Sequence, residues 1–222
     1  MRTKNKLLIF DMDGTLYNFK EGSFKKSSLK KKVLSNALIF IEDKLSIDKP
    51  EAKKIFKKIK ASYGENISIG LEKEYKLDRY EYFNFVWNIP AKNLVVKNYR
   101  IKKILTELSS KNKIILLSDS PKIWIENVLK ELGLYDLLKN NIYSGESDFR
   151  KIFGNIFNQI LQKLNYNPKD CLMIGDQEKT DIIPAKKAGI KTIFLGLKKS
   201  KHADLTIKNI TEIKKAIDII WT

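Results

Sequence analysis

Cysteine is almost absent from this sequence, and so are long apolar runs. Cys171 is the only cysteine among 222 residues, so no disulfide can form within the chain and a scaffold held by disulfides is excluded. No apolar run approaches the roughly 20 residues that a membrane-spanning helix needs. The basic N-terminal residues run into only four apolar residues, 7–10, which is too short for a secretory signal. We therefore expect a cytoplasmic protein with no membrane segment.

Arginine is also scarce, although the formal net charge is +17. Only four of the 43 basic residues are arginines, namely Arg2, Arg79, Arg100 and Arg150. The rest are lysines, spread over nearly every expected helix. Proteins that read nucleic acids favour the planar arginine fork, whereas scattered lysines are typical of a solvated surface. We therefore do not expect a nucleic-acid partner.

Four short apolar runs have the pattern of strands that are buried on both faces. They cover residues 7–10, 114–117, 171–174 and 192–195, and helical patterns follow them. One helix is expected between Pro121 and Gly133, which suit a helix start and end, and another at about 151–163. Alternating strands and helices predict an α/β protein with a doubly wound parallel sheet. Such sheets bind ligands beyond the carboxyl ends of their strands.

Residues 17–96 break this alternation. They have helical patterns near residues 29–44, 50–62 and 78–87, joined by a looser segment at 63–76, and they contain no convincing buried strand. We therefore expect an α-helical cap at residues 17–96, inserted into an α/β core made of residues 1–16 and 97–222.

Two carboxylates, Asp11 and Asp13, follow the first expected strand. At the end of a strand they can converge on one cation, and Gly14 permits a tight turn beside them. A hard divalent ion such as Mg²⁺ prefers oxygen ligands and leaves sites for a substrate phosphate. The alternative is a plain Asp-Gly turn that closes the strand.

The segment from Asp11 to Tyr17 resembles the first motif of the haloacid dehalogenase superfamily, Asp-x-Asp-x-Thr-Leu, and later stretches resemble further motifs in the same order. The resemblance implies a Rossmann-like core with a helical cap between the first and second motifs. It also implies that Asp11 attacks phosphorus and forms an aspartyl-phosphate, while Asp13 protonates the leaving alkoxide and then deprotonates water. Dehalogenases of the superfamily have a different residue in place of Asp13, so phosphate chemistry is favoured.

The second and third stretches contain candidates for binding the phosphoryl group. Ser118 resembles the hydroxyl residue of the second motif, which binds that group; a helix N-cap is the alternative. Asp119 departs from the Asn or Gly of many relatives, and we expect its side chain to point elsewhere or to tune substrate choice. Lys151 takes the place of the family lysine that neutralises the nucleophile and the phosphoryl oxygens. The family's prolines are missing there, and Arg150 is the neighbouring substitute.

Asp176 and Asp181 belong to a stretch that resembles the acidic fourth motif of the family. By this resemblance Asp176 binds magnesium, and Asp181 is a second ligand or an orienting group; a helix cap is the structural alternative for Asp181. The expected ligands of Mg²⁺ are therefore Asp11, Asp13, Asp176 and Asp181. Without the metal, so many carboxylates in one cleft would repel one another and some would bind protons.

Together these residues predict a Mg²⁺-dependent phosphatase that hydrolyses a small phosphomonoester, of the nucleotide or sugar phosphate class, through an aspartyl-phosphate. The partner is then a small phosphorylated metabolite, and the protein is a monomer or a homodimer. The alternatives are a sugar phosphomutase on the same core, a phosphonate hydrolase, and a nucleic-acid-binding or regulatory protein that uses the basic surface.

Overall fold

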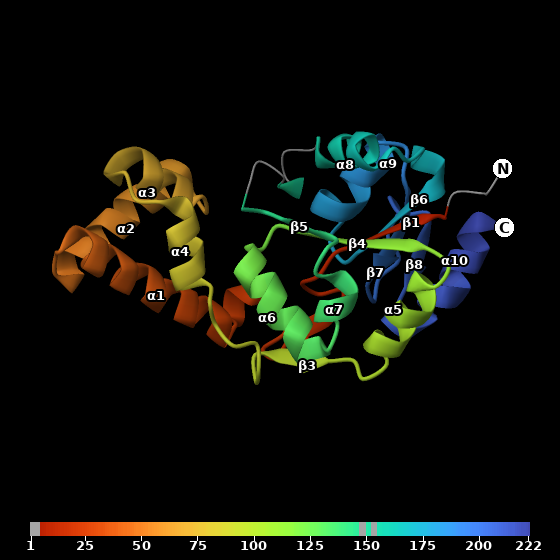
Figure 1. Ribbon diagram of the computed structural model, residues 1–222, viewed down its shortest axis with the longest axis horizontal. Coiled ribbons are helices and arrows are strands. Elements are labelled where there is room, and N and C mark those ends of the chain that lie inside the picture. The colour runs from red at the N-terminus through yellow and green to blue at the C-terminus, as the bar shows by residue number, and fades with distance from the viewer. Residues whose placement is uncertain (1–4, 147–149, 152–154) are drawn as a thin grey trace.

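The chain forms two lobes, an α/β lobe and a smaller helical lobe (Figure 1). The computed structural model describes residues 5–146, 150–151 and 155–222. Of the stretch expected to hold the family lysine, residues 148–149 and 152–154 therefore lie outside the described residues, as do 152–154 of the helix expected there.

A six-stranded parallel sheet forms the centre of the α/β lobe. In spatial order its strands are β5 (Ile142–Ser144), β4 (Lys113–Ser118), β1 (Leu7–Phe10), β6 (Cys171–Gly175), β7 (Lys191–Leu195) and β8 (Leu205–Ile207). Phe10, the last residue of β1, lies beside Leu116 of β4 and Ile174 of β6. The chain therefore leaves these three central strands at the same edge of the sheet.

Helices cover both faces of the sheet (Figure 1). They are α5 (Ile101–Ser109), α6 (Lys122–Leu132), α7 (Tyr135–Leu138), α8 (Ile156–Leu164), α9 (Ile183–Lys187) and α10 (Ile213–Trp221). Alternate side chains of β1 point to opposite faces, so Leu8 and Phe10 pack with α5, α6, α7 and α10, while Leu7 and Ile9 pack with α8 and α9. The predicted doubly wound α/β fold is confirmed.

All four expected strands are present, as β1, β4, β6 and β7. The two further strands, β5 and β8, lie at the edges of the sheet and have only three residues each. Most of their side chains are half-buried, so neither strand has the continuous apolar run that marks a strand covered on both faces. The expected helix at about 151–163 corresponds to α8, which begins at Ile156.

The helical lobe has a hydrophobic cluster of its own. Its helices are α1 (Ser28–Leu45), α2 (Lys49–Tyr63), α3 (Ile67–Tyr75) and α4 (Arg79–Val86). Buried side chains from all four helices, among them Phe40, Ile59, Leu71 and Tyr82, form this cluster. It supports the proposed division into core and cap. None of the helices described in either lobe combines the length and the apolar character needed to cross a bilayer.

Two short strands connect the lobes, where the sequence pattern predicts none. β2 (Tyr17–Phe19) pairs antiparallel with β3 (Val95–Lys97). The central residues of these strands, Asn18 and Val96, are exposed. A three-residue strand is also too short to produce a recognisable alternation, so the sequence shows no convincing buried strand at 17–96. The pair lies where the chain enters and leaves the expected cap.

The looser segment expected at 63–76 contains α3 instead. Gly70 lies within this helix, and glycine disfavours helices, so the local pattern does not favour one. A Cβ on Gly70 would lie 2.6 Å from Cγ2 of Ile59 and 2.7 Å from Cδ2 of Tyr63. Gly70 therefore lets α3 pack closely on α2, and this packing outweighs the low helix propensity.

Gly70→Ala should destabilise the protein, although alanine favours helices by about 1 kcal/mol relative to glycine. The added methyl group overlaps Ile59 and Tyr63, and overpacking of this kind typically costs about 1–3 kcal/mol. We expect a lower thermal midpoint of unfolding, measured by circular dichroism. Ser62→Ala, on the exposed face of α2, is the control and should leave the midpoint nearly unchanged. A midpoint of Gly70→Ala at or above that of the wild type contradicts the close packing.

Candidate active site

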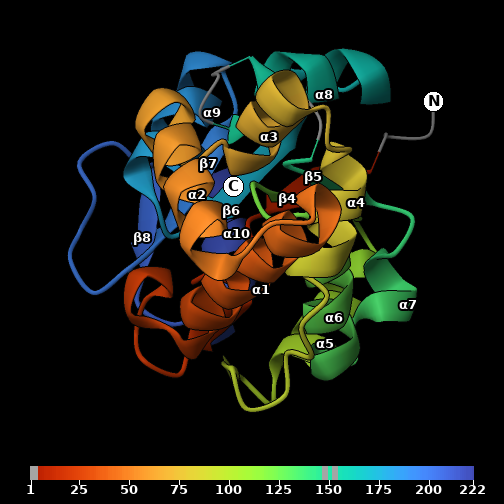
Figure 2. The same cartoon turned by 90° about the vertical axis from the view of Figure 1, so that its left-hand side faces the viewer.

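The candidate site lies at the carboxyl edge of the sheet, facing the helical lobe. Asp11 follows β1, Ser118 ends β4 and Asp176 follows β6. A cavity of about 690 Å³ opens there, lined by residues of both lobes. Figure 2 views the molecule from the side of the helical lobe, with α1 to α4 in front of the sheet. This edge is where parallel sheets bind ligands.

Asp11 is held by two neighbours in an almost closed environment. Nζ of Lys151 donates to Oδ1 of Asp11 at 2.5 Å and to Oδ1 of Asp181 at 2.6 Å. Oγ1 of Thr15 donates to Oδ2 of Asp11 at 3.1 Å. Asp11 is 2% exposed, Lys151 3% and Asp181 0%, so water contributes little to their solvation.

Asp11, Asp176 and Asp181 form a cluster in which one carboxylate oxygen of each lies within 4.8 Å of the others. Three carboxylates and the ammonium group of Lys151 leave two negative charges in excess, which a divalent cation balances. Oδ1 of Asp176 is buried and has no hydrogen-bond partner among the described residues. A set of converging carboxylate oxygens, one of them unsatisfied, is what a hard cation such as Mg²⁺ prefers. The residues therefore fit the expected ion.

Two glycines make room for these carboxylates. Gly14 has a φ of 91°, which disfavours other residues, and a Cβ there would overlap Oδ2 of Asp176. A Cβ on Gly175 would overlap Oδ2 of Asp181. Oδ2 of Asp181 also accepts a hydrogen bond from the main-chain nitrogen of Gln177 at 3.0 Å. The side chain of Asp181 thus orients both Lys151 and the turn after β6. The sequence alone leaves three roles open for Asp181, namely a metal ligand, an orienting group and a helix cap.

Burial and mutual repulsion shift the titration of this cluster. Burial, together with Asp11 and Asp181, raises the pKa of Asp176 to about 8. Burial also raises the pKa of Asp181, although Lys151 opposes this shift. Burial lowers the pKa of Lys151, but the charges of Asp11 and Asp181 outweigh it and raise this pKa overall. Lys151 is therefore a permanent cation, whereas Asp176 binds a proton when no metal ion is present.

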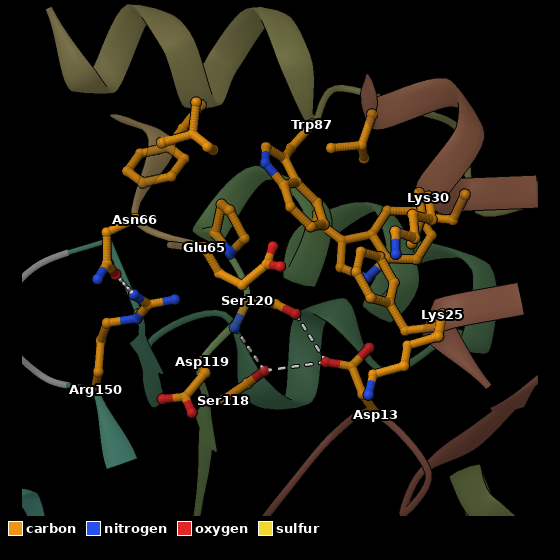
Figure 3. A pocket seen from close by; sticks show the side chains of 18 of the residues that line it. Asp13, Lys25, Lys30, Glu65, Asn66, Trp87, Ser118, Asp119, Ser120 and Arg150 are labelled. Atoms are coloured by element: carbon orange, nitrogen blue, oxygen red, sulfur yellow. Dashed lines mark hydrogen bonds between the residues drawn. The ribbon is translucent and has the colours of Figure 1, made fainter. Parts of the chain in front are cut away.

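Asp13 lies outside this cluster, and its carboxylate faces hydroxyl groups (Figure 3). The hydroxyl of Tyr17 donates to Oδ1, and Oδ2 accepts from Oγ of Ser120 at 2.8 Å and from Oγ of Ser118 at 3.4 Å. Burial and the charge of Asp11 raise the pKa of Asp13. This position suits a group that carries a proton. The expectation that Asp13 is also a metal ligand stays a prediction.

Asp119 contacts the main chain of the site lysine. Its Oδ1 accepts a hydrogen bond from the main-chain nitrogen of Lys151 at 2.7 Å, so the side chain of Asp119 holds the main chain at Lys151 in position. Arg150, the neighbouring substitute for the family lysine, instead donates from Nη1 to Oδ1 of Asn66 in the helical lobe (Figure 3). Lys151 and not Arg150 therefore lies beside Asp11.

Sequence reasoning misses several of these contacts. It identifies neither the hydroxyl of Thr15 as a partner of Asp11 nor the hydroxyls of Tyr17 and Ser120 as partners of Asp13. Thr15 and Tyr17 each follow the carboxylate that they contact by four residues, a spacing that the tight turn at Gly14 could have indicated. No local signal connects Ser120 to Asp13, because they are 107 residues apart.

Comparisons with known proteins agree with this geometry. A family model described as a haloacid dehalogenase-like hydrolase matches residues 5–189. The glyceraldehyde 3-phosphate phosphatase of Methanocaldococcus jannaschii is 26% identical over 227 residues, which cover 96% of this chain and 96% of that enzyme. The N-acylneuraminate-9-phosphatase of Mus musculus is 26% identical over 123 residues, 55% of this chain and 49% of that enzyme. The chain spans about half the length of most curated relatives that it matches.

A similar fold is known from crystal structures. The crystal structure of a HAD phosphatase from Thermococcus onnurineus has a TM-score of 0.64 and 21% sequence identity with this chain, and the match covers 96% of this chain and 97% of that one. At this identity the likeness demonstrates the shared fold.

Magnesium should stabilise the protein more strongly as the pH rises. In the metal-free protein the pKa of Asp176 is about 8, above its ordinary value of 3.8. Between these values the folded chain keeps a proton that the unfolded chain has lost, so the stability of the metal-free protein falls as the pH rises through this range. Mg²⁺ requires the deprotonated carboxylate, and its binding stabilises the folded state.

The thermal midpoint in Mg²⁺ minus that in EDTA should therefore be small at about pH 5.5 and large near pH 8. Asp176→Asn is the matched variant: it removes the titrating group and one ligand, so the difference should be small at both pH values. A wild-type difference that is equal at both pH values contradicts the assignment of Asp176.

Proposed function

This chain belongs to the haloacid dehalogenase-like hydrolases, and from this premise we propose that it is a phosphatase that hydrolyses a small phosphomonoester with the help of Mg²⁺. The observation that carries the proposal is the position of Asp11, which is buried beside Lys151 and close to the carboxylates of Asp176 and Asp181. Asp13, a second carboxylate, lines the same cavity. The relatives named as phosphatases of small phosphorylated metabolites support the proposal.

In the first step, the carboxylate of Asp11 attacks the phosphorus atom and the bond between phosphorus and the ester oxygen breaks. The product is an aspartyl-phosphate and an alcohol. The ammonium group of Lys151 offsets the negative charge on Asp11 and on the phosphoryl oxygens, so that the two anions can approach each other. The hydroxyl of Ser118, at the edge of the same cavity, binds a phosphoryl oxygen.

Asp13 supplies the proton for the leaving alcohol and recovers it in the second step. Burial and the charge of Asp11 raise its pKa, which favours the protonated form that the first step needs. Hydrogen bonds from Tyr17 and Ser120 fix the orientation of its carboxyl group. In the second step Asp13 takes a proton from water, the water oxygen bonds to phosphorus, and the bond to Asp11 breaks. Phosphate is released and Asp11 is restored.

Asp11, Asp176 and Asp181 would hold Mg²⁺, and the bound ion would supply positive charge that lowers the repulsion between the nucleophile and the phosphoryl group. Asp181 also accepts the second hydrogen bond of Lys151, so it sets the position of the ammonium group relative to Asp11. The cavity of about 690 Å³ falls within the range of about 300–1,000 Å³ that is typical of small-molecule sites. A small phosphorylated metabolite is therefore the substrate class.

Asp11→Asn and Asp13→Ala should each abolish turnover, because the first removes the nucleophile and the second removes the acid and base. With p-nitrophenyl phosphate and Mg²⁺, we expect phosphate release to fall by about a thousandfold or more in each variant. Asp218→Asn, which alters an exposed carboxylate on α10, is the control and should keep wild-type activity. Normal turnover by Asp11→Asn contradicts the proposed mechanism.

Asp119→Ala should lower kcat by about tenfold or more, because small misplacements of a charged group are costly in catalysis. The variant loses the acceptor for the main-chain nitrogen of Lys151 while the lysine side chain remains. Asp119→Asn keeps an acceptor oxygen and should recover most of the activity, with KM close to that of the wild type. Equal losses in the two variants show that the charge of Asp119, and not its hydrogen bond, is what matters.

A further inference from the structure

Two arginines line the cavity and have no ion-pair partner among the residues that the structure describes. Arg79 begins α4 in the helical lobe, and Arg150 immediately precedes Lys151 in the α/β lobe. All ion pairs found among the described residues involve lysines. Neither guanidinium group therefore has a described carboxylate within ion-pair distance, although the charge of Arg79 acts on the carboxylate of Glu146 from farther away.

The groups that the two arginines do contact are neutral. Arg150 donates from Nη1 to the amide oxygen of Asn66, and Arg79 donates from Nη2 to the main-chain oxygen of Glu146. The carboxylate of Glu146 accepts from the main-chain nitrogen of Lys122 at 2.8 Å. The Nε atoms of Arg79 and Arg150 are both buried and have no partner within the described part of the chain.

An arrangement of this kind is unfavourable unless an anion completes it. Both arginines are half-buried, but each has a buried Nε donor without a described acceptor, and a donor in that state is unfavourable. The planar guanidinium group matches the oxygens of a carboxylate or a phosphate, with two parallel hydrogen bonds. Arg79 and Arg150, with their unsatisfied Nε donors, are therefore suited to bind an oxyanion.

The part of the cavity that Arg79 and Arg150 line is distinct from the end that takes the transferring phosphoryl group. That end already has a cation, Lys151, and two hydroxyls, those of Ser118 and Ser120. Figure 3 shows Arg150 directed towards Asn66, on the side of the cavity away from Asp13. Arg79 lies on α4 and contacts Glu146, which is outside the acidic cluster.

We propose that the substrate carries a second oxyanionic group, a carboxylate or a further phosphate, and that Arg79 and Arg150 bind this group while Asp11 attacks the transferring phosphoryl group. Lys25 and Lys30 also line the cavity and add to the positive potential that attracts a substrate with two anionic groups. The proposal rests on the proposed phosphatase activity and narrows its substrate class.

The test compares phosphomonoesters that differ only in the second anion. The matched pairs are 3-phosphoglycerate with glycerol 3-phosphate and 6-phosphogluconate with sorbitol 6-phosphate for a carboxylate, and fructose 1,6-bisphosphate with fructose 6-phosphate for a phosphate. Release of phosphate by the wild type in Mg²⁺ gives kcat/KM for each. We expect at least one member with two anionic groups to be preferred by about tenfold or more, since a desolvated charged hydrogen bond has this effect. The pair that shows this preference identifies the second anion as a carboxylate or a phosphate.

Arg79→Gln and Arg150→Gln should reduce this preference about tenfold each, mainly through a higher KM, and leave turnover of the partner that has only one anionic group nearly unaffected. Arg100→Gln is the matched control, because Arg100 is exposed at the start of α5 and does not line the cavity. It should keep the wild-type ratio. The ratio of the two kcat/KM values is measured on one variant at a time, so it does not depend on the fraction of that protein that is folded.

Two results overturn the proposal. One is a wild-type enzyme that turns over both members of every pair equally. The other is an Arg150→Gln variant that loses activity equally on both members, which means that Arg150 binds the transferring phosphoryl group. If the wild type releases no phosphate from any of the esters or from p-nitrophenyl phosphate, the proposed phosphatase activity itself fails, and that outcome is separate from either of these.

Discussion

The site depends on one buried ammonium group placed among carboxylates. Lys151 contacts Asp11 and Asp181 in a region almost closed to solvent. Moving these charges out of water is costly, and only close pairing and hydrogen bonding offset that cost. Because the lysine balances one of the three negative charges in the cluster, the remaining two match a divalent cation.

The fold brings these groups together from distant parts of the chain. β1, β4 and β6 are neighbours in a parallel sheet, so the residues that follow them meet at one edge. Glycine then decides how closely the loops approach, because a side chain at Gly14 or Gly175 would displace Asp176 or Asp181. The cluster is therefore a property of strand order and loop packing, and no single segment contains it.

The sequence pattern predicts those parts of the fold and the site that depend on residues close to one another in the chain. The central strands β1, β4, β6 and β7 are covered on both faces and are therefore continuous apolar runs in the sequence, whereas the short edge strands have no such run. Asp11, Ser118 and Asp176 stand out because each comes at the end of such a run. The sequence pattern does not predict the helix α3, because Gly70 has a low helix propensity. Its contact with α2, which only the folded structure shows, explains why a glycine lies there. The bonds from Asp119 to Lys151 and from Arg150 to Asn66 join segments that only the tertiary fold brings into contact.

Lys151 and Arg150 are consecutive residues with partners in different lobes. Their Cα atoms are about 3.8 Å apart, yet Lys151 contacts Asp11 in the α/β lobe and Arg150 contacts Asn66 in the helical lobe. Asp119 fixes the main chain of this pair, so the cation for the transferring phosphoryl group and the proposed cation for a second anion have a common attachment to the sheet. A movement of the helical lobe that displaces Asn66 therefore acts on Arg150 first, while Lys151 stays bound to the acidic cluster.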